Sequence, residues 1–140
     1  MTLVATVLSD GPDGFDPVGE AVRATLDGHL VLERSRAAAG RFPAIDLLAS
    51  ASRTLTDVAG PEHRRGAALL RSAVAALDRA RDARSVGLDP TAGDPFLARC
   101  IAEEAAIERF LCQSDTPVSA AATLTELGDL ADRIDDGRPL

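Results

Sequence analysis

The chain has 140 residues, of which 46% are hydrophobic, 26% charged and only 3% aromatic. This balance excludes an intrinsically disordered chain and predicts a globular fold with a core of Ala, Leu and Val rather than aromatic residues. The net charge of −7 argues against a nucleic-acid-binding protein, because such proteins normally carry excess basic residues that contact phosphates.

The lack of a recognisable targeting signal and the spacing of the two cysteines predict a cytoplasmic protein. No apolar run reaches the length of a transmembrane helix, and the first 14 residues lack the basic start and long apolar stretch of a signal peptide. Cys100 and Cys112 are the only cysteines, and without a Cys-x-x-Cys pair no zinc site is expected. Both should be free thiols in a reducing cytosol, on different sides of one predicted helix.

The first part of the chain mixes short strands and helices. Thr2–Ser9 is β-branched and apolar, which predicts a buried strand. Asp16 and Pro17 predict a helix start, as N-cap and first helical residue, and Gly28 should end that helix. A short strand, a helix, an extended apolar stretch and a polar loop are then predicted at residues 29–33, 34–39, 44–49 and 50–57.

The second part is predicted to form three helices. Pro61 opens the first, which should run to about Arg84, Asp94-Pro95 opens the second, and Thr116-Pro117 opens the third. The apolar stripe of the second helix is Leu97, Cys100, Ile101, Ile107 and Leu111. The seam of the third is Ala120, Leu124, Leu127, Ala131 and Ile134. The chain thus divides near residue 58, with an α/β part at 1–58 and an antiparallel three-helix bundle at 59–140.

A search for catalytic residues by type and spacing finds little. The chain has no Gly-x-x-x-x-Gly-Lys-Ser/Thr loop for phosphates, and it contains no lysine at all. No serine or cysteine nucleophile has a base nearby in sequence. His29 and His63 are isolated and are best interpreted as packing or capping residues, and no metal ligand set is expected.

Two sequence blocks carry a resemblance to a known family. Asp27–Leu32 (DGHLVL) and Phe42–Arg53 (FPAIDLLASASR) closely resemble the DGHIVL and YPAIDVLASVSR blocks of flagellar and type III secretion export ATPases. These ATPases are homohexameric relatives of the catalytic head of rotary ATP synthase. The resemblance covers roughly residues 2–113 and includes Thr6–Leu8, Asp16–Pro17, Ala21–Arg23, Pro61–Arg64, Val86–Gly87, Asp94–Pro95 and Phe110–Leu111.

The resemblance implies a fold and two functional residues. The fold would be α+β and mainly helical: the C-terminal fragment of a RecA-like α/β nucleotide-binding domain, followed by the helical bundle. Arg53 matches the arginine finger, which reaches across a hexamer interface to the γ-phosphate of ATP, where a planar, always-charged guanidinium stabilises the transferring phosphoryl. Phe42 matches the aromatic that stacks on adenine. The alternatives are an ordinary surface arginine and a core aromatic packed on Ile45 and Leu47.

The implied function is ATP-driven export of flagellar or effector proteins, and the shared motifs leave both systems open. The intact enzyme would use ATP and Mg²⁺ and contact export chaperones, secretion substrates and, peripherally, a membrane-embedded export apparatus. The phosphate-binding loop (Walker A) and the magnesium-holding acid (Walker B) lie upstream of this region in the family. The chain alone should therefore bind no cofactor and hydrolyse no ATP.

A non-enzymatic alternative is a helical adaptor or truncated relic that docks on export chaperones or on the intact ATPase. An exposed apolar seam around Leu124 and Ile134, used for dimerisation, would favour it. An unpaired strand at Thr2–Ser9 would instead favour a fragment of the larger enzyme. An unrelated small-molecule enzyme has no supporting set of residues.

Overall fold

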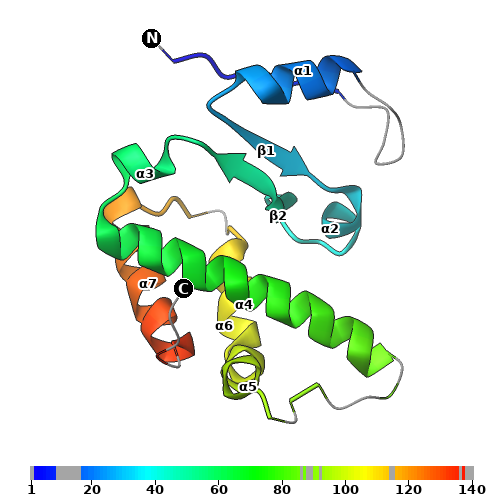
Figure 1. The fold of residues 1–140 in the computed structure, drawn as a ribbon, viewed down its shortest axis with the longest axis vertical. Helices are drawn as coiled ribbons and strands as arrows, with labels where there is room; N and C mark the ends of the chain where they lie inside the picture. The colour runs from blue at the N-terminus through cyan, green and yellow to red at the C-terminus, as the bar shows by residue number, and fades with distance from the viewer. Residues whose placement is uncertain are drawn as a thin grey trace.

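The computed structural model describes residues 2–8, 17–85, 87, 90–91, 93–113, 116–135 and 137, and within them the fold is mainly helical with one small sheet. The sheet, α1 and α2 lie on one side of the long helix α4, whereas α5 and α7 lie on the other (Figure 1). The elements are α1 (Pro17–Thr25), β1 (Gly28–Leu32), α2 (Arg34–Ala38), β2 (Ile45–Ser52), α3 (Leu55–Val58), α4 (Pro61–Ser85), α5 (Pro95–Ala102), α6 (Glu104–Leu111) and α7 (Ala120–Ile134).

The core lies between α4 and the helices that follow it. Leu70, Val74 and Leu77 are buried at spacings of four and three residues along α4, as expected for the apolar face of an amphipathic helix. They belong to a cluster completed by Leu69, Ala73, Cys100, Ile107, Leu127, Leu130, Ala131 and Ile134. Leu47 and Leu48 of β2 pack against the same cluster, so the sheet is attached to the helical core through β2.

Several predicted elements are confirmed. The strand expected at 29–33 is β1, the helix expected at 34–39 is α2, and α4 begins at Pro61 as predicted. Asp94 is the N-cap of α5, where its carboxylate accepts a hydrogen bond from the Leu97 N–H at 3.1 Å. None of the helices in the described part of the chain combines the length and apolarity that a membrane span requires.

The strand predicted at Thr2–Ser9 is wrong. Residues 2–8 belong to no strand, and the side chains of Leu3, Val4 and Leu8 are 76%, 90% and 91% exposed. A strand needs hydrogen-bonding neighbours, and the sheet of the described residues contains only β1 and β2. Ser9 lies outside the described residues.

Two boundaries near the sheet also differ from the prediction. The predicted N-cap Asp16 lies outside the described residues. The helix α1 runs from Pro17 to Thr25, so it ends before the predicted terminator Gly28, which is the first residue of β1. The polar loop predicted at 50–57 is instead the end of β2 followed by α3. Ser50 is accommodated in the strand because its hydroxyl bonds to the Val31 N–H and the Asp46 carbonyl, and Ser52 pairs with Gly28 in the ladder.

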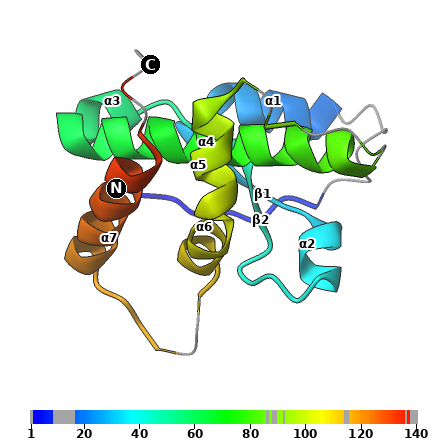
Figure 2. The same ribbon diagram turned by 90° about the horizontal axis from the view of Figure 1, so that it is seen from below.

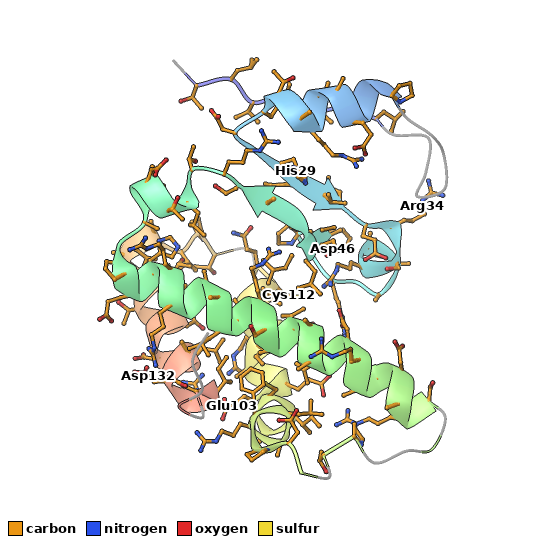
Figure 3. All side chains as sticks on the ribbon, viewed as in Figure 1. His29, Arg34, Asp46, Glu103, Cys112 and Asp132 are labelled. Carbon is orange, nitrogen blue, oxygen red and sulfur yellow. The ribbon has the colours of Figure 1, made fainter. Side chains whose placement is uncertain are left out.

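The single helix predicted from Asp94 to about Leu111 is also wrong, because it is broken into α5 and α6 at Glu103. This residue adopts φ −96° and ψ 5°, outside helical geometry. Its carboxylate pairs with Arg133 of α7 at 2.9 Å, a tertiary contact that helical periodicity does not report. Glu103 and Asp132 lie on the side of α4 away from the sheet (Figure 3).

The third predicted helix starts later than expected, and the bundle geometry differs. Its N-cap is Ser119, whose hydroxyl accepts from the Ala122 N–H at 3.2 Å, so the helix begins at Ala120 rather than at Thr116-Pro117. α5 and α7 cross α4 at steep angles instead of running antiparallel to it (Figure 2). Four helices, α4 to α7, therefore replace the predicted antiparallel bundle of three.

Candidate functional site

The predicted site residues flank an irregular hairpin. β1 and β2 are antiparallel, with Gly28 opposite Ser52 and His29 opposite Ala51 at one end, and Val31 opposite Asp46 at the other. Residues 47–50 of β2 therefore lie opposite Leu30 alone. We call Leu47–Ser50 the β2 bulge. Bulges bend a strand and redirect the side chains that follow them, so this one affects the direction of the residues after β2.

Side chains of the hairpin itself hold part of the β2 bulge. The Asp46 carboxylate accepts hydrogen bonds from the backbone N–H groups of Leu48 at 2.8 Å and Ala49 at 2.9 Å. Ser50 is buried, with only 6% of its surface exposed. Its hydroxyl donates a hydrogen bond to the Asp46 carbonyl and accepts one from the Val31 N–H at 3.0 Å. His29 and Asp46 both lie on the hairpin (Figure 3), and His29 Nε2 is 3.1 Å from the Ala49 carbonyl oxygen.

Arg71 on α4 holds the bulge from the other side. Its guanidinium donates three hydrogen bonds to backbone carbonyls, those of Leu47 at 2.5 Å, Leu48 at 3.1 Å and Ser50 at 3.1 Å. A guanidinium suits this task because its five N–H groups form a rigid planar fork. The bulge is thereby fixed to the longest helix of the fold.

Arg53 follows directly after β2. Its backbone N–H donates to the Asp27 carbonyl at 2.7 Å, which continues the hairpin by one hydrogen bond. Its exposed guanidinium donates to the carbonyls of Ala24 at 2.9 Å and Arg23 at 3.3 Å, at the C-terminal end of α1. The last carbonyls of a helix have no partner within the helix, so here the side chain acts as a cap.

Phe42 lies before β2 and is 57% exposed, so it is not a core aromatic packed on Ile45 and Leu47. Its carbonyl accepts a hydrogen bond from the Gln113 N–H at 2.8 Å. The neighbouring Arg41 forms an ion pair with Glu108 of α6 at 3.2 Å. The backbone at Phe42 is thus tied to the helical core while its ring faces solvent.

The structure does not bring the two predicted site residues together. Phe42 and Arg53 flank opposite ends of β2, and the partner strand β1 has five residues, which span about 14 Å between its first and last Cα. Among the described residues, no group of three or more His, Cys, Asp or Glu is arranged to hold a metal ion.

Comparisons with known proteins cover the hairpin and most of the chain. Residues 1–52 match the ATP synthase alpha/beta family, nucleotide-binding domain. The flagellum-specific ATP synthase of Salmonella typhimurium is 40% identical over 113 residues, covering 81% of this chain and 25% of that protein. A type 3 secretion system ATPase of Sinorhizobium fredii is 39% identical over 119 residues, covering 85% of this chain and 26% of that protein.

Solved structures agree. The assembled ATPase EscN from the enteropathogenic E. coli type III secretion system superimposes with a TM-score of 0.82 at 33% identity, covering 89% of this chain and 31% of that chain. The same ATPase in complex with its central stalk EscO gives a TM-score of 0.77 at 34% identity, over 82% of this chain and 29% of that chain. The chain is a relative of the flagellar and type III secretion ATPases. It spans roughly a quarter to a third of the length of these relatives.

The family predicted from the sequence blocks is thus confirmed. The sequence analysis did not identify the three residues whose side chains hold the β2 bulge. Asp46 and Ser50 lie inside the matching block, yet residue order does not show that Asp46 binds the N–H groups two and three residues further on, or that Ser50 bonds to Val31, 19 residues earlier. Arg71 is one of 15 basic residues in the chain. The only sequence signal was its position next to the apolar face of α4, beside Leu70 and Val74.

Proposed function

We propose that this chain supplies two nucleotide contacts of an ATPase that drives flagellar or type III protein export. Arg53 acts as the arginine finger, and Phe42 stacks on adenine. The observation that supports the proposal most is the way Arg53 is held at the end of β2. Its backbone is fixed at the end of β2, while its guanidinium lies on the exposed surface against neutral acceptors.

The finger role requires Arg53 to leave the end of α1. In phosphoryl transfer, negative charge on the γ-phosphoryl oxygens is stabilised by positive groups placed around them. Hydrogen bonds from a guanidinium to an anionic oxygen are roughly twice as strong as those between neutral groups. A neighbouring subunit's ATP would therefore compete effectively for Arg53 against the carbonyls of Ala24 and Arg23, which water can solvate once they are released.

Phe42 and Arg53 would serve different nucleotides. Because they flank opposite ends of β2, one ATP is poorly placed to contact both in the same subunit. In a ring of subunits, Phe42 would contact the ATP bound by its own subunit and Arg53 the ATP of the neighbour. The homo-oligomer, a hexamer in the resembled family, is therefore part of the proposal, and the solved relative is described as an assembled ATPase.

Hydrolysis needs sequence that these 140 residues do not contain. The chain has no Gly-x-x-x-x-Gly-Lys-Ser/Thr loop, and in the resembled family the acid that holds magnesium lies upstream of this region. The whole activity, with ATP and Mg²⁺, would belong to an assembled ATPase. The exposed side chains of Leu3, Val4 and Leu8, together with Leu30 and Leu32 of β1, would pack there against the remainder of the nucleotide-binding domain.

The division near residue 58 fits this proposal. α3 ends at Val58, and α4 to α7 would form the part that meets export chaperones and secretion substrates at the cytoplasmic face of the export apparatus. The adaptor alternative relied on an exposed seam around Leu124 and Ile134. Ile134 is 0% exposed and packs in the core, so this seam offers little support for dimerisation.

The test uses a hybrid in which residues 1–140 replace the matching C-terminal part of the Salmonella typhimurium relative. We expect Arg53→Ala to lower kcat about 10³-fold or more while leaving the affinity for a fluorescent ATP analogue unchanged. We expect Phe42→Ala to weaken that affinity about tenfold, in line with the contribution of one base-stacking aromatic. Arg79→Ala, an exposed arginine of α4, is the matched control and should change neither.

Each residue has its own refuting outcome. Equal hydrolysis by the Arg53→Ala hybrid and its parent would leave capping of α1 as the only role of Arg53. Unchanged analogue affinity in the Phe42→Ala hybrid would remove the stacking role of Phe42 without affecting the finger.

A further inference from the structure

We infer that Arg71 is a positioning residue for the finger Arg53, acting through the β2 bulge without touching the nucleotide. The inference rests on the proposed function of Arg53. Arg71 lies in α4 and is partly buried, and its guanidinium meets three backbone carbonyls of the bulge within 3.1 Å. The ion pairs found among the described residues of α4 involve Arg65, Arg81 and Arg84, whereas Arg71 is used for the carbonyls.

The carbonyls need such a partner because the bulge takes them out of the ladder. Residues 47–50 lie opposite a single residue of β1, so most of their backbone groups have no partner on the other strand. Buried or half-buried backbone groups without partners are costly, so side chains replace the missing ladder bonds. Asp46 satisfies two N–H groups, and Arg71 satisfies three carbonyls.

The bulge sets the direction of Arg53 through strand register. Directly after Ser50 the ladder resumes, with Ala51 opposite His29 and Ser52 opposite Gly28, and the Arg53 N–H then bonds to Asp27. Side chains alternate between the two faces of a strand, so a change of one residue in the bulge would turn every following side chain to the opposite face. The number of residues that the bulge holds therefore decides on which face Arg53 emerges.

Arg71 supplies the specific restraint, while other contacts keep the fold together. Leu47 and Leu48 pack against the helical core, and the Ser50 hydroxyl ties the bulge to Val31. Removing the guanidinium should leave the hairpin attached but let the bulge sample other lengths. Arg71 thereby differs from a core residue, whose loss would destabilise the whole fold.

The first test measures hydrogen exchange in the 140-residue chain, with no nucleotide involved. We expect Arg71→Ala to speed exchange of the backbone amides in residues 47–53 about tenfold or more, while amides of α7 keep their protection. Arg71→Lys, which keeps the charge and three donors but loses the planar fork, should fall between Ala and the parent. Ser50→Ala, a smaller change to the same bulge, should speed the same amides, and Arg79→Ala should not.

The second test places the same variants in the hybrid ATPase. We expect Arg71→Ala to lower kcat about 10–100-fold, as for a misplaced catalytic group, with KM for ATP unchanged and partial recovery in Arg71→Lys. If Arg53→Ala lowers kcat and Arg71→Ala does not, the positioning role is wrong and the finger stands. If Arg53→Ala leaves kcat unchanged, the finger itself is wrong. Equal loss of protection in the bulge and in α7 would also overturn the inference, because Arg71 would then stabilise the whole fold.

Discussion

Two glycines in α4 and α7 should respond with opposite signs to the same substitution. A Cβ on Gly66 of α4 would lie 2.9 Å from Cγ and 3.3 Å from Cδ2 of Leu127 in α7. A Cβ on Gly128 of α7 would have no neighbour within 4 Å. In a helix interior, replacing glycine by alanine gains about 1 kcal/mol of stability, while overpacking a core contact costs about 1–3 kcal/mol.

These contributions give the expected changes in the free energy of unfolding. Gly128→Ala should raise the free energy of unfolding by about 1 kcal/mol, whereas Gly66→Ala should lower it by up to about 2 kcal/mol. The entropy of unfolding near the midpoint is about 0.3 kcal/mol per kelvin for a chain of this length, so the two melting temperatures should differ by about 3–10 °C. Thermal unfolding followed by far-UV circular dichroism gives both values.

Gly66 and Gly128 control for each other because each variant adds the same methyl group to a helix. If Gly66→Ala raises the melting temperature as much as Gly128→Ala does, α4 and α7 do not approach each other at Gly66. The close packing of Leu127 against α4 at this position would then be incorrect.

Two further predictions concern α7. Ile134→Ala should lower the unfolding free energy by about 2–5 kcal/mol in urea denaturation, because Ile134 is fully buried. Leu124→Ala should cost much less, because Leu124 is 44% exposed. Similar losses in the two variants would contradict this packing. The pKa of Asp135 is lowered by the hydrogen bond from the Gly137 N–H and by Arg65, so its stabilising effect is present above the ordinary carboxyl pKa and lost as pH falls through the lowered value. Asp135→Asn should therefore lower the urea midpoint at neutral pH and match the parent in acid; a constant difference across pH would exclude this linkage.

Much of the fold was predictable because its signals are local. Proline at Pro61 and the cap at Asp94 mark helix starts through backbone chemistry that needs no tertiary contact. The apolar spacing along α4 predicted which face is buried. The resemblance of two short blocks to export ATPases was also readable, since it depends only on residue order.

The incorrect predictions involve residues whose conformation depends on distant partners. Thr2–Ser9 has the composition of a strand, but strand formation depends on neighbours that the described residues do not provide. Glu103 is a good helix former, yet it interrupts the helix where its carboxylate meets Arg133. Propensity is a weak preference of less than about 1 kcal/mol per residue, which a single tertiary contact can override.

The sequence by itself determined the family, the helical character, and the two residues proposed to contact nucleotide, Phe42 and Arg53. The tertiary structure decided that Phe42 and Arg53 flank opposite ends of β2, and that a four-residue bulge precedes the finger. It also decided that Arg71, 18 positions further along the chain than Arg53, holds that bulge. The reason is that these features depend on backbone groups left without ladder partners, and only the folded chain determines which side chain reaches them.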